Sequence, residues 1–414
     1  MGVVERVKNH WRSLRRVHRR RGTVNTVEKA LRWLGKQPQY HFRRYRRDVV
    51  VPADLRVFCS SRGNYWRYCD GCGVCVECDS VTPPVPPEFR SAAKTYSVGP
   101  SFVYELPNAS LVTSDGTDGA RLHKDGTLLL RNRDELLSSD PLDTPPSSSR
   151  RSSSDIERRR HRECVFPLVY GGSNFFVWMY EFLPQLRARE HYRETTGQTP
   201  EVVVSGDPPE WMVRSLRAVG VAEENIVELR SDQVSTDTLV FTTRRAIYTS
   251  GDYNLYCPDT LRWLRRTVID GEIAENATRR IYISRQDADF RHVVNEGELL
   301  SELQNWGFEK YVLSEMSFEN QVRVFSEAEA VVAPHGAGLV HLLWADDPVV
   351  LELIPETYLR LTYFLLSNSL GLSYDAILAE SASRQRLTAN NHDIRVDVSE
   401  LRAALTETLE PRVE

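Results

Sequence analysis

A strand-forming run directly before a glycine-rich turn lies within residues 329–344. The run at 330–333 breaks at Pro334, and Gly336 and Gly338 follow it. An apolar segment with helical spacing comes next, so the order indicates a strand, a tight turn and the start of a helix. The free backbone amides of such a turn can bind a phosphate group. A Gly-x-Gly turn of this kind is equally compatible with tight packing between strand and helix.

Strands and helices alternate through most of the chain after residue 174. Continuous apolar strands separated by helices are typical of parallel sheets that are covered on both faces. We therefore expect an α/β fold with two Rossmann-like blocks that meet near residue 250. Strands are expected at 202–204, 226–229, 239–242, 281–283, 311–313, around 331 and at 349–353, and helices at 174–192, 209–219, 258–270, 296–306, 318–328, 338–344 and 399–409.

Several of these segments resemble the signature of glycosyltransferase family 61. The likeness covers roughly residues 94–378 and is most specific in the C-terminal half. Two positions depart from the family pattern, because Val177 stands in place of a histidine and His341 in place of an asparagine. The matching residues are 281–285 (Ile-Tyr-Ile-Ser-Arg), Arg291, Asn295 with Glu296, 334–339 (Pro-His-Gly-Ala-Gly-Leu), 350–355, and upstream 173–178 with Glu181, Leu183 and Pro184.

The resemblance implies a GT-B architecture and an inverting, metal-independent sugar transfer that needs no cofactor for catalysis. The donor would be a nucleotide sugar bound in the C-terminal block. The acceptor would be a hydroxyl of a glycan or lipid-linked glycan, as in the synthesis of surface polysaccharides, bound in the cleft between the blocks.

The predicted donor site stabilises the departing diphosphate. The turn would offer its backbone amides, Arg285 would pair with phosphate oxygens with Arg291 as a second cation, and Glu352 would accept hydrogen bonds from the ribose. A structural role stays open for each, with Arg285 as a helix cap and Glu352 as the partner of a neighbouring arginine. The full predicted donor set is Arg285, Arg291, Asn295, His335, Gly336, Ala337, Gly338 and Glu352.

The acceptor cleft and the catalytic base are expected on the upstream block. Asn174 and Trp178 would line the cleft, whereas Val177 cannot transfer a proton. Glu181 lies two helical turns after Asn174, so both would face the cleft, and neighbouring aromatic side chains would raise the pKa of its carboxyl. A solvated helix glutamate is the alternative. His335 is the second candidate base, because an unperturbed imidazole titrates near pH 6.5.

Two other functions are compatible with the sequence. Asp287 and Asp289 form an Asp-x-Asp tripeptide that resembles the metal site of a different glycosyltransferase architecture, and such an enzyme would be inhibited by EDTA. The loss of a base at Val177 is also compatible with a non-catalytic module that binds nucleotides or anions.

A run of four cysteines at Cys-x-x-Cys spacing lies outside the family pattern. The spacing predicts a structural zinc site or an iron–sulfur cluster, and Cys59 could replace one ligand. A flexible loop rich in thiols is the alternative. The predicted metal ligands are Cys69, Cys72, Cys75 and Cys78.

The N-terminal region is strongly basic. Residues 1–50 carry a net charge of +12, against −4 for the whole chain. Two amphipathic helices predicted within residues 1–36 would either dock on an anionic membrane surface or pack on the body of the protein. No nucleic-acid-binding motif is present, and we do not expect a nucleic-acid partner.

The chain shows no apolar run of about 18 residues and no apolar core of a secretion signal. With seven cysteines as well, we expect a cytoplasmic protein that is peripheral at the inner face of the membrane when the basic helices dock. The predicted segments are a basic helical arm (1–48), a Cys-rich segment (49–97), a β-rich lead-in (98–137), a disordered Ser/Pro/Arg linker (138–162), an acceptor-side Rossmann-like domain (163–250) and a donor-binding Rossmann-like domain (251–414).

Overall fold

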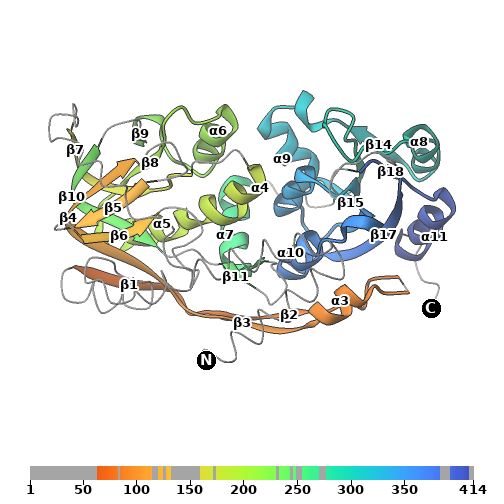
Figure 1. Cartoon of the computed structure of the whole chain (residues 1–414), viewed down its shortest axis with the longest axis horizontal. Helices are drawn as coiled ribbons and strands as arrows, with labels where there is room; N and C mark the ends of the chain where they lie inside the picture. The colour runs from red at the N-terminus through yellow and green to blue at the C-terminus, as the bar shows by residue number, and fades with distance from the viewer. Residues whose placement is uncertain are drawn as a thin grey trace, which may run out of the picture.

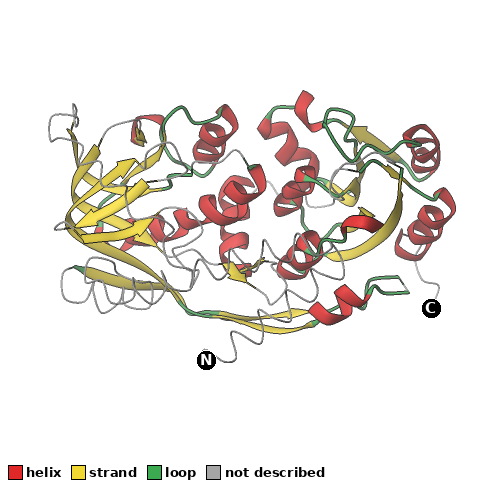
Figure 2. Cartoon of the chain, viewed as in Figure 1, coloured by secondary structure: helices red, strands yellow, loops and turns green. Residues whose placement is uncertain are grey.

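The computed structural model describes a mixed α/β protein with two main sheets and helices between them (Figures 1 and 2). The predicted basic arm lies outside the described residues, as does the predicted linker up to residue 158. No helix in the described part of the chain is long and apolar enough to span a membrane. The described residues are 63–82, 84–113, 120–124, 127–131, 159–170, 174–229, 233–242, 246–248, 254–269, 277–382 and 392–409.

The first sheet combines parallel and antiparallel strands in the order β6-β5-β4-β10-β7-β8-β9, with β1 also paired to β4. Strands β10, β7, β8 and β9 are parallel, and β4 joins them antiparallel to β10. The predicted lead-in is therefore part of this sheet rather than a separate unit. The strands are β1 (Asn64–Cys69), β4 (Ser101–Thr113), β5 (Ala120–Lys124), β6 (Thr127–Arg131), β7 (Arg159–Pro167), β8 (Glu201–Ser205), β9 (Ile226–Leu229) and β10 (Gln233–Thr242).

Strand β7 also corrects the predicted linker. Residues 159–162 pair with β10, so the disordered segment expected up to residue 162 cannot extend past residue 158. Charged residues can occupy this strand because its N-terminal half is only partly buried, whereas Val165 and Phe166 further along it are fully buried.

The second sheet has the order β14-β13-β15-β16-β17-β18 and is parallel except for β18. Alternate residues along its strands enter two different cores. Tyr282 and Val332 pack with helices α8 and α11, whereas Ile283 and Val331 belong to the core that contains α9 and α10. The strands are β13 (Arg279–Ile283), β14 (Phe308–Tyr311), β15 (Ala328–Pro334), β16 (Val349–Pro355), β17 (Ser373–Ser381) and β18 (Ile394–Arg395).

The helices of this half confirm most of the predicted periodicity. The expected strand at 311–313 is wrong by about three residues, because β14 ends at Tyr311 and a 3₁₀ turn begins at Leu313. The α10–β17 unit was not predicted. The helical elements are α8 (Glu296–Asn305), η5 (Leu313–Glu315), α9 (Phe318–Ser326), η6 (Ala337–Trp344), η7 (Glu356–Tyr358), α10 (Thr362–Leu370) and α11 (Val398–Leu409).

A helical layer lies between the two sheets (Figure 1). The predicted helix at 174–192 exists, but it contains one wide π turn and one 3₁₀ turn and continues to Thr196. The elements are α4 (Phe175–Val177), η2 (Trp178–Phe182), η3 (Leu183–Gln185), α5 (Leu186–Thr196), α6 (Glu210–Ala218), η4 (Glu223–Asn225), α7 (Pro258–Ile269) and the short hairpin of β11 (Ala246–Tyr248) and β12 (Asn254–Tyr256).

A strap formed by β2 (Cys72–Val76), α3 (Pro87–Ala92) and β3 (Lys94–Val98) runs from the first sheet to the second along one side of the molecule (Figure 1). Its contacts with the second half are specific. The hydroxyl of Ser80 donates to the Tyr374 carbonyl at 2.7 Å, and the amide of Thr82 donates to the Asp375 carboxylate at 2.9 Å. The Phe89 ring packs on Phe364 with centroids 4.7 Å apart. The strap therefore joins both halves.

Candidate active site

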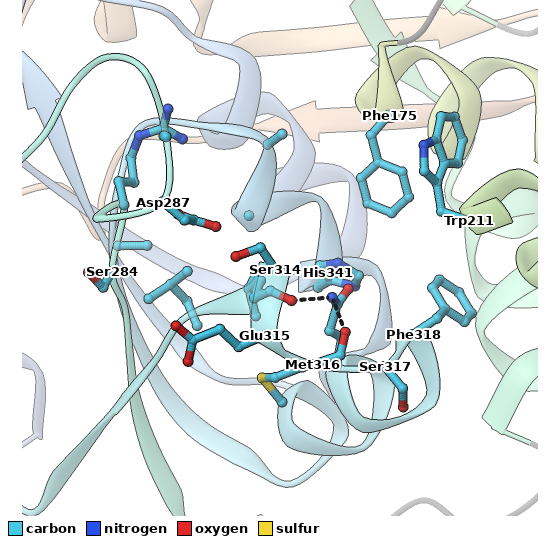
Figure 3. Close-up of a pocket in the computed structure, with 18 of the residues that line it drawn as sticks. Phe175, Trp211, Ser284, Asp287, Ser314, Glu315, Met316, Ser317, Phe318 and His341 are labelled. Carbon is cyan, nitrogen blue, oxygen red and sulfur yellow. Dashed lines mark hydrogen bonds between the residues drawn. The ribbon is translucent and has the colours of Figure 1, made fainter. Parts of the chain in front are cut away.

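A cavity of about 700 Å³ opens between the two halves (Figure 3). The N-terminal half supplies Phe175 from α4 and Trp211 from α6, whose rings meet edge to face at 5.2 Å. The C-terminal half supplies the ends of β13 and β15 and the segments that follow them. Ligand sites in open α/β sheets commonly lie at these carboxyl ends. The lining residues are Phe175, Glu210, Trp211, Arg214, 283–285, Asp287, Ala288, 313–318, Gln321, Ala333, Pro334, Ala337, Gly338 and His341.

Of the two arginines predicted for the sugar-donor site, Arg285 is the one that lies on the cavity wall. Its guanidinium donates two hydrogen bonds to the carbonyl of Phe290, at 3.2 and 3.0 Å, and forms no salt bridge with any described residue. Burial, followed by the neighbouring charge of Arg291, lowers its pKa to about 10. The charge of Asp287 acts in the opposite direction but forms no salt bridge with the guanidinium, so this partly desolvated cation is electrostatically suited to an incoming anion.

Gly336 makes room for this guanidinium. A Cβ at this position would lie 2.0 Å from Nη1 of Arg285, so a side chain here would displace the arginine. The backbone of Gly336 is extended, and its carbonyl accepts a hydrogen bond from the Tyr363 hydroxyl. The predicted glycine turn and the predicted cation are therefore in direct contact.

The predicted helix after Gly336 is present as the 3₁₀ helix η6. Ala337 is exposed and lines the cavity, and the first amides of a helix lack intrahelical acceptors. Gly338 lines the cavity as well. It also packs tightly, since a Cβ there would lie 3.1 Å from Ile283 and 3.2 Å from Leu313. Ala337 thus lines the cavity, whereas Gly338 both lines the cavity and packs closely against the protein.

Arg291 adopts a left-handed backbone, with φ of 63°, and its Nε donates to the His335 carbonyl at 2.9 Å. Burial lowers the pKa of this guanidinium too. The contact ties the loop after β13 to the end of β15 and keeps the second predicted cation next to Arg285.

Glu352 does not occupy the predicted ribose position. Its side chain is completely buried, accepts from the Tyr374 hydroxyl at 2.6 Å and lies 2.5 Å from Nδ1 of His335. This hydrogen bond holds the imidazole ring of His335 against the Glu352 carboxyl group. Glu352 therefore orients His335. His335 itself is buried beside the cavity and does not line it.

Asn295 is likewise structural. Its side-chain amide exchanges two hydrogen bonds with the backbone of Val396, at 2.9 and 3.1 Å, and is buried. Trp178 is fully buried and donates to the Ser215 hydroxyl at 2.8 Å, so it belongs to the core and not to the acceptor cleft. Asn174 is exposed and caps α4 by accepting from the Val177 amide.

Glu181 is wrong as the base of this cavity. The carboxylate is buried, lies 3.3 Å from the Tyr256 hydroxyl and lines a separate cavity of about 20 Å³. The physical reason is the π turn of η2, because a wider turn shifts the seven-residue spacing from Asn174 off a common helix face. The prediction required regular α-helical turns from Asn174 to Glu181, whereas the chain forms a short α-helix followed by a π turn.

Two aromatic side chains and His341 were missed as lining residues. Phe175 belongs to the upstream motif and could have been chosen, whereas nothing in the local sequence marks Trp211. His341 accepts a hydrogen bond on Nδ1 from the Trp344 indole at 3.1 Å, and complete burial lowers its pKa to about 3. The imidazole is therefore neutral, with its proton on Nε2, and is a donor rather than a base.

The predicted four-cysteine site is not assembled. Cys72 and Cys75 lie on the strand β2, where residues three apart point to opposite sides and are about 10 Å apart. Cys75 is exposed, and its thiol donates to the Glu77 carboxylate at 3.3 Å. Among the described residues, Cys69 gathers instead with Cys257 and Asp259.

Parts of this chain are similar in sequence to known glycosyltransferases. Residues 175–351 match the family model described as Glycosyltransferase 61. The beta-1,2-xylosyltransferase RCN11 of Oryza sativa subsp. japonica is 31% identical over 120 residues, which are 25% of this chain and 22% of that protein. The EGF domain-specific O-linked N-acetylglucosamine transferase of Gallus gallus is 31% identical over 96 residues, 22% of this chain and 18% of that protein.

The beta-1,2-xylosyltransferase of Arabidopsis thaliana is 29% identical over 99 residues, 20% of this chain and 18% of that protein. The matched segments thus span about a fifth of the length of these relatives. The family match covers Phe175 on one wall of the cavity and Arg285 and Gly336 on the other. The chain therefore contains a domain of glycosyltransferase family 61 over residues 175–351.

Proposed function

We propose that the protein transfers a sugar from a nucleotide sugar to an acceptor hydroxyl in the cavity between its two halves, which adopt a GT-B arrangement. The observation that carries this proposal is the partly desolvated guanidinium of Arg285 on the cavity wall, which forms no salt bridge with any described residue although Asp287 lies near enough for its charge to act on it. The departing nucleoside diphosphate supplies the missing anion. Its negative charge grows as the glycosidic bond breaks, so a fixed cation stabilises the transition state more than the ground state.

The exposed start of η6 is the second part of this donor site. The amides of Ala337 and Gly338 lie on the same cavity wall as Arg285 and can donate to phosphate oxygens. Arg291, held behind Arg285 by the His335 carbonyl, adds positive potential to the pocket. The names of the relatives put xylosyl and N-acetylglucosaminyl nucleotides first among donors to be tested.

The opposite wall suits the acceptor. Phe175 and Trp211 present aromatic surface on the N-terminal side of the cavity (Figure 3), and such rings pack against the apolar face of a sugar. The donor and acceptor walls face each other, which supports direct attack by the acceptor hydroxyl and inversion at the anomeric carbon.

The proton acceptor has to come from the cavity wall, because Glu181 and Val177 are unsuitable. Glu210 is engaged by Arg214, whose Nε lies 3.0 Å from its carboxylate. Glu315 lines the cavity, and its carboxylate has no partner among the described residues. We assign the base to Glu315. His335, oriented by Glu352, positions the donor loop through its backbone contact with Arg291.

A metal-independent reaction is part of the proposal. Asp287 lines the cavity, but Asp289 does not, so the tripeptide does not present two carboxylates to one diphosphate. Arg285 and the amides take the place that a divalent cation has in Asp-x-Asp enzymes.

The test combines nucleotide binding and turnover. Thermal stabilisation of the full chain is measured with nucleoside diphosphates and nucleotide sugars, in EDTA and in Mg²⁺ or Mn²⁺, and donor cleavage is followed by release of the diphosphate. We expect a selective shift that persists in EDTA. Ala337→Asp, which adds a carboxylate to the exposed cavity wall, should abolish the shift, whereas Ala403→Asp on the exposed side of α11 should not.

A non-catalytic nucleotide-binding module is the second candidate, favoured by the burial of Glu181 away from the cavity. Binding without any diphosphate release, with acceptor sugars present, would select it. No binding of any nucleotide to the wild-type chain would overturn both functions.

A further inference from the structure

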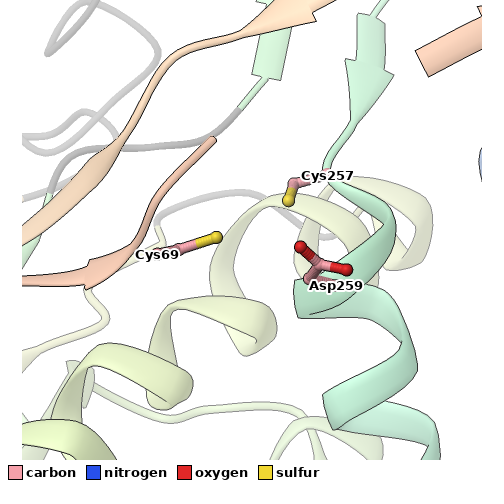
Figure 4. A group of neighbouring side chains, drawn as sticks. All are labelled: Cys69, Cys257 and Asp259. Atoms are coloured by element: carbon pink, nitrogen blue, oxygen red, sulfur yellow. The ribbon is translucent and has the colours of Figure 1, made fainter. Parts of the chain in front are cut away.

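Three potential metal ligands converge where the strap meets the central helices. Cys69, Cys257 and Asp259 each offer one ligand atom, and these atoms lie within 4.8 Å of one another. Figure 4 shows the three side chains pointing toward a common point. Cys72 lies beside this group, with its sulfur 3.8 Å from that of Cys257, and a change of its side-chain rotamer would bring it in as a fourth ligand. None of these residues lines the cavity described above.

The chain builds one half of this cluster at a tight turn. Cys69 ends β1 and Cys72 begins β2, so only Asp70 and Gly71 separate them. Gly71 has a φ of +88°, which favours glycine, and a Cβ there would lie 2.4 Å from the Val98 carbonyl. Position 71 therefore favours glycine, and Cys69 and Cys72 come from two successive strands, β1 paired with β4 and β2 paired with β3.

The other half lies at the start of α7. The buried Cys257 precedes the helix, and its carbonyl accepts from the Leu261 amide. Pro258 fits the first helical position, where a proline needs no amide hydrogen bond. Asp259 follows in the first turn. One ligand from β1, one from β2 and two from the start of α7 form the set, and 185 residues separate Cys72 from Cys257.

We propose that Cys69, Cys72, Cys257 and Asp259 bind one zinc ion. Tetrahedral zinc holds sulfur at about 2.3 Å, which places two sulfur ligands about 3.8 Å from each other. The separation of Cys72 and Cys257 matches this edge, whereas a disulfide needs sulfurs about 2.05 Å apart. On binding, each thiol releases its proton to solvent and coordinates as a thiolate. Arg262, with Nη1 3.6 Å from the Asp259 carboxylate, offsets part of the negative charge.

The ion has a structural role at this place. Four protein ligands close the coordination sphere, which is typical of structural zinc and leaves no position for a substrate. Strand β1 continues into the strap that contacts the second half, and α7 packs against both α10 and η6. Zinc therefore fastens the strap to the helix that supports the cavity wall. Cys69 and Cys72 precede the matched family domain, while Cys257 and Asp259 belong to it.

The test is the metal content of the full chain, purified without chelator, by inductively coupled plasma mass spectrometry. We expect about one zinc ion per wild-type chain. Cys257→Ser should lose it. Cys75→Ser is the matched control, because Cys75 is exposed on β2, the strand that begins at Cys72, and its thiol contacts Glu77 outside the cluster. Equal zinc content in the wild type and Cys257→Ser overturns the proposal.

A second variant keeps the test decisive if Cys257→Ser does not fold. Asp259 has a side chain that is 60% exposed, so Asp259→Asn should fold and bind zinc at least tenfold more weakly in competition with a chromophoric chelator. Cobalt-substituted protein should show sulfur-to-cobalt charge transfer and the intense visible bands of a tetrahedral ion. The site is refuted if the cobalt-substituted protein shows neither the charge-transfer band nor the intense visible bands. It is also refuted if the wild-type chain contains no zinc and alkylation shows that Cys72 and Cys257 form a disulfide.

Discussion

Replacing Arg285 by alanine should affect nucleotide binding and protein stability in different ways. In the free protein this guanidinium forms no salt bridge with any described residue, and its charge is opposed by burial and by Arg291. In Arg285→Ala the folded state loses the two hydrogen bonds from the guanidinium to the Phe290 carbonyl. Removal of the unfavourable buried charge offsets that loss, so we expect the free energy of unfolding to change by less than about 1 kcal/mol.

The nucleotide loses a charged hydrogen-bond donor in the same variant. Such a bond contributes about 1.5–3 kcal/mol, which corresponds to a rise of about 10- to 150-fold in the Kd for a nucleoside diphosphate. Titration calorimetry measures the Kd, and urea unfolding without ligand measures stability. Lysine should restore only part of the affinity, because an ammonium cannot donate two parallel bonds to one phosphate.

Arg280→Ala is the matched control, because Arg280 lies on β13, the strand that ends two residues before Arg285. Arg280 lies 2.6 Å from the Glu329 carboxylate and donates to the Trp306 carbonyl, away from the cavity. It should lose stability and keep its nucleotide affinity. If Arg285→Ala lowers stability as Arg280→Ala does and leaves the Kd unchanged, Arg285 is a structural cation and the argument from its desolvation is wrong.

Three further outcomes are expected. Because burial lowers the pKa of His341 to about 3, the unfolded chain binds a proton below about pH 6.5 that the folded chain does not. The free energy of unfolding therefore decreases as the pH is lowered, by about 2 kcal/mol at pH 5. Urea titrations at pH 7 and pH 5 measure this loss, and His341→Asn should remove it. The same loss of stability between pH 7 and pH 5 in His341→Asn as in the wild type would contradict this. Glu352→Gln leaves one of its two buried partners, the Tyr374 hydroxyl or the His335 ring, poorly paired, so the Tm should fall by the equivalent of about 1–3 kcal/mol with the nucleotide Kd little changed. Phe175→Ala should raise the KM for the acceptor a few-fold, because about 0.5–1.5 kcal/mol of ring packing is lost. If the variant instead changes the Kd for the donor, Phe175 does not belong to the acceptor wall.

Much of the secondary structure could be predicted because it is encoded locally. The apolar run before Pro334 forms a buried parallel strand, and the spacing of apolar residues in 318–328 forms a helix that buries Val322 and Phe325. The α10–β17 unit was missed, since α10 buries seven of its nine residues and has no polar face to produce a helical period.

The side of the cavity that we propose for the donor was partly predictable for the same reason. Arg285 and Gly336 lie at strand ends, and in a parallel sheet these ends share one edge, so sequence position nearly fixes their location. Glu352 shows the limit of this argument, because it lies within a strand whose side chains alternate between faces. Whether it meets a ribose or His335 depends on which face carries the cavity.

The sequence by itself determined the alternation of strands and helices, the family of residues 175–351 and the cation and glycine that meet on the donor wall. Only the tertiary structure decided that Glu181 turns into the protein interior and that Cys69 meets Cys257 rather than Cys75. The physical reason is the range of the forces involved. Periodicity and turn chemistry act over a few residues, whereas an irregular helical turn or a contact across nearly 190 residues is fixed by packing of the whole chain.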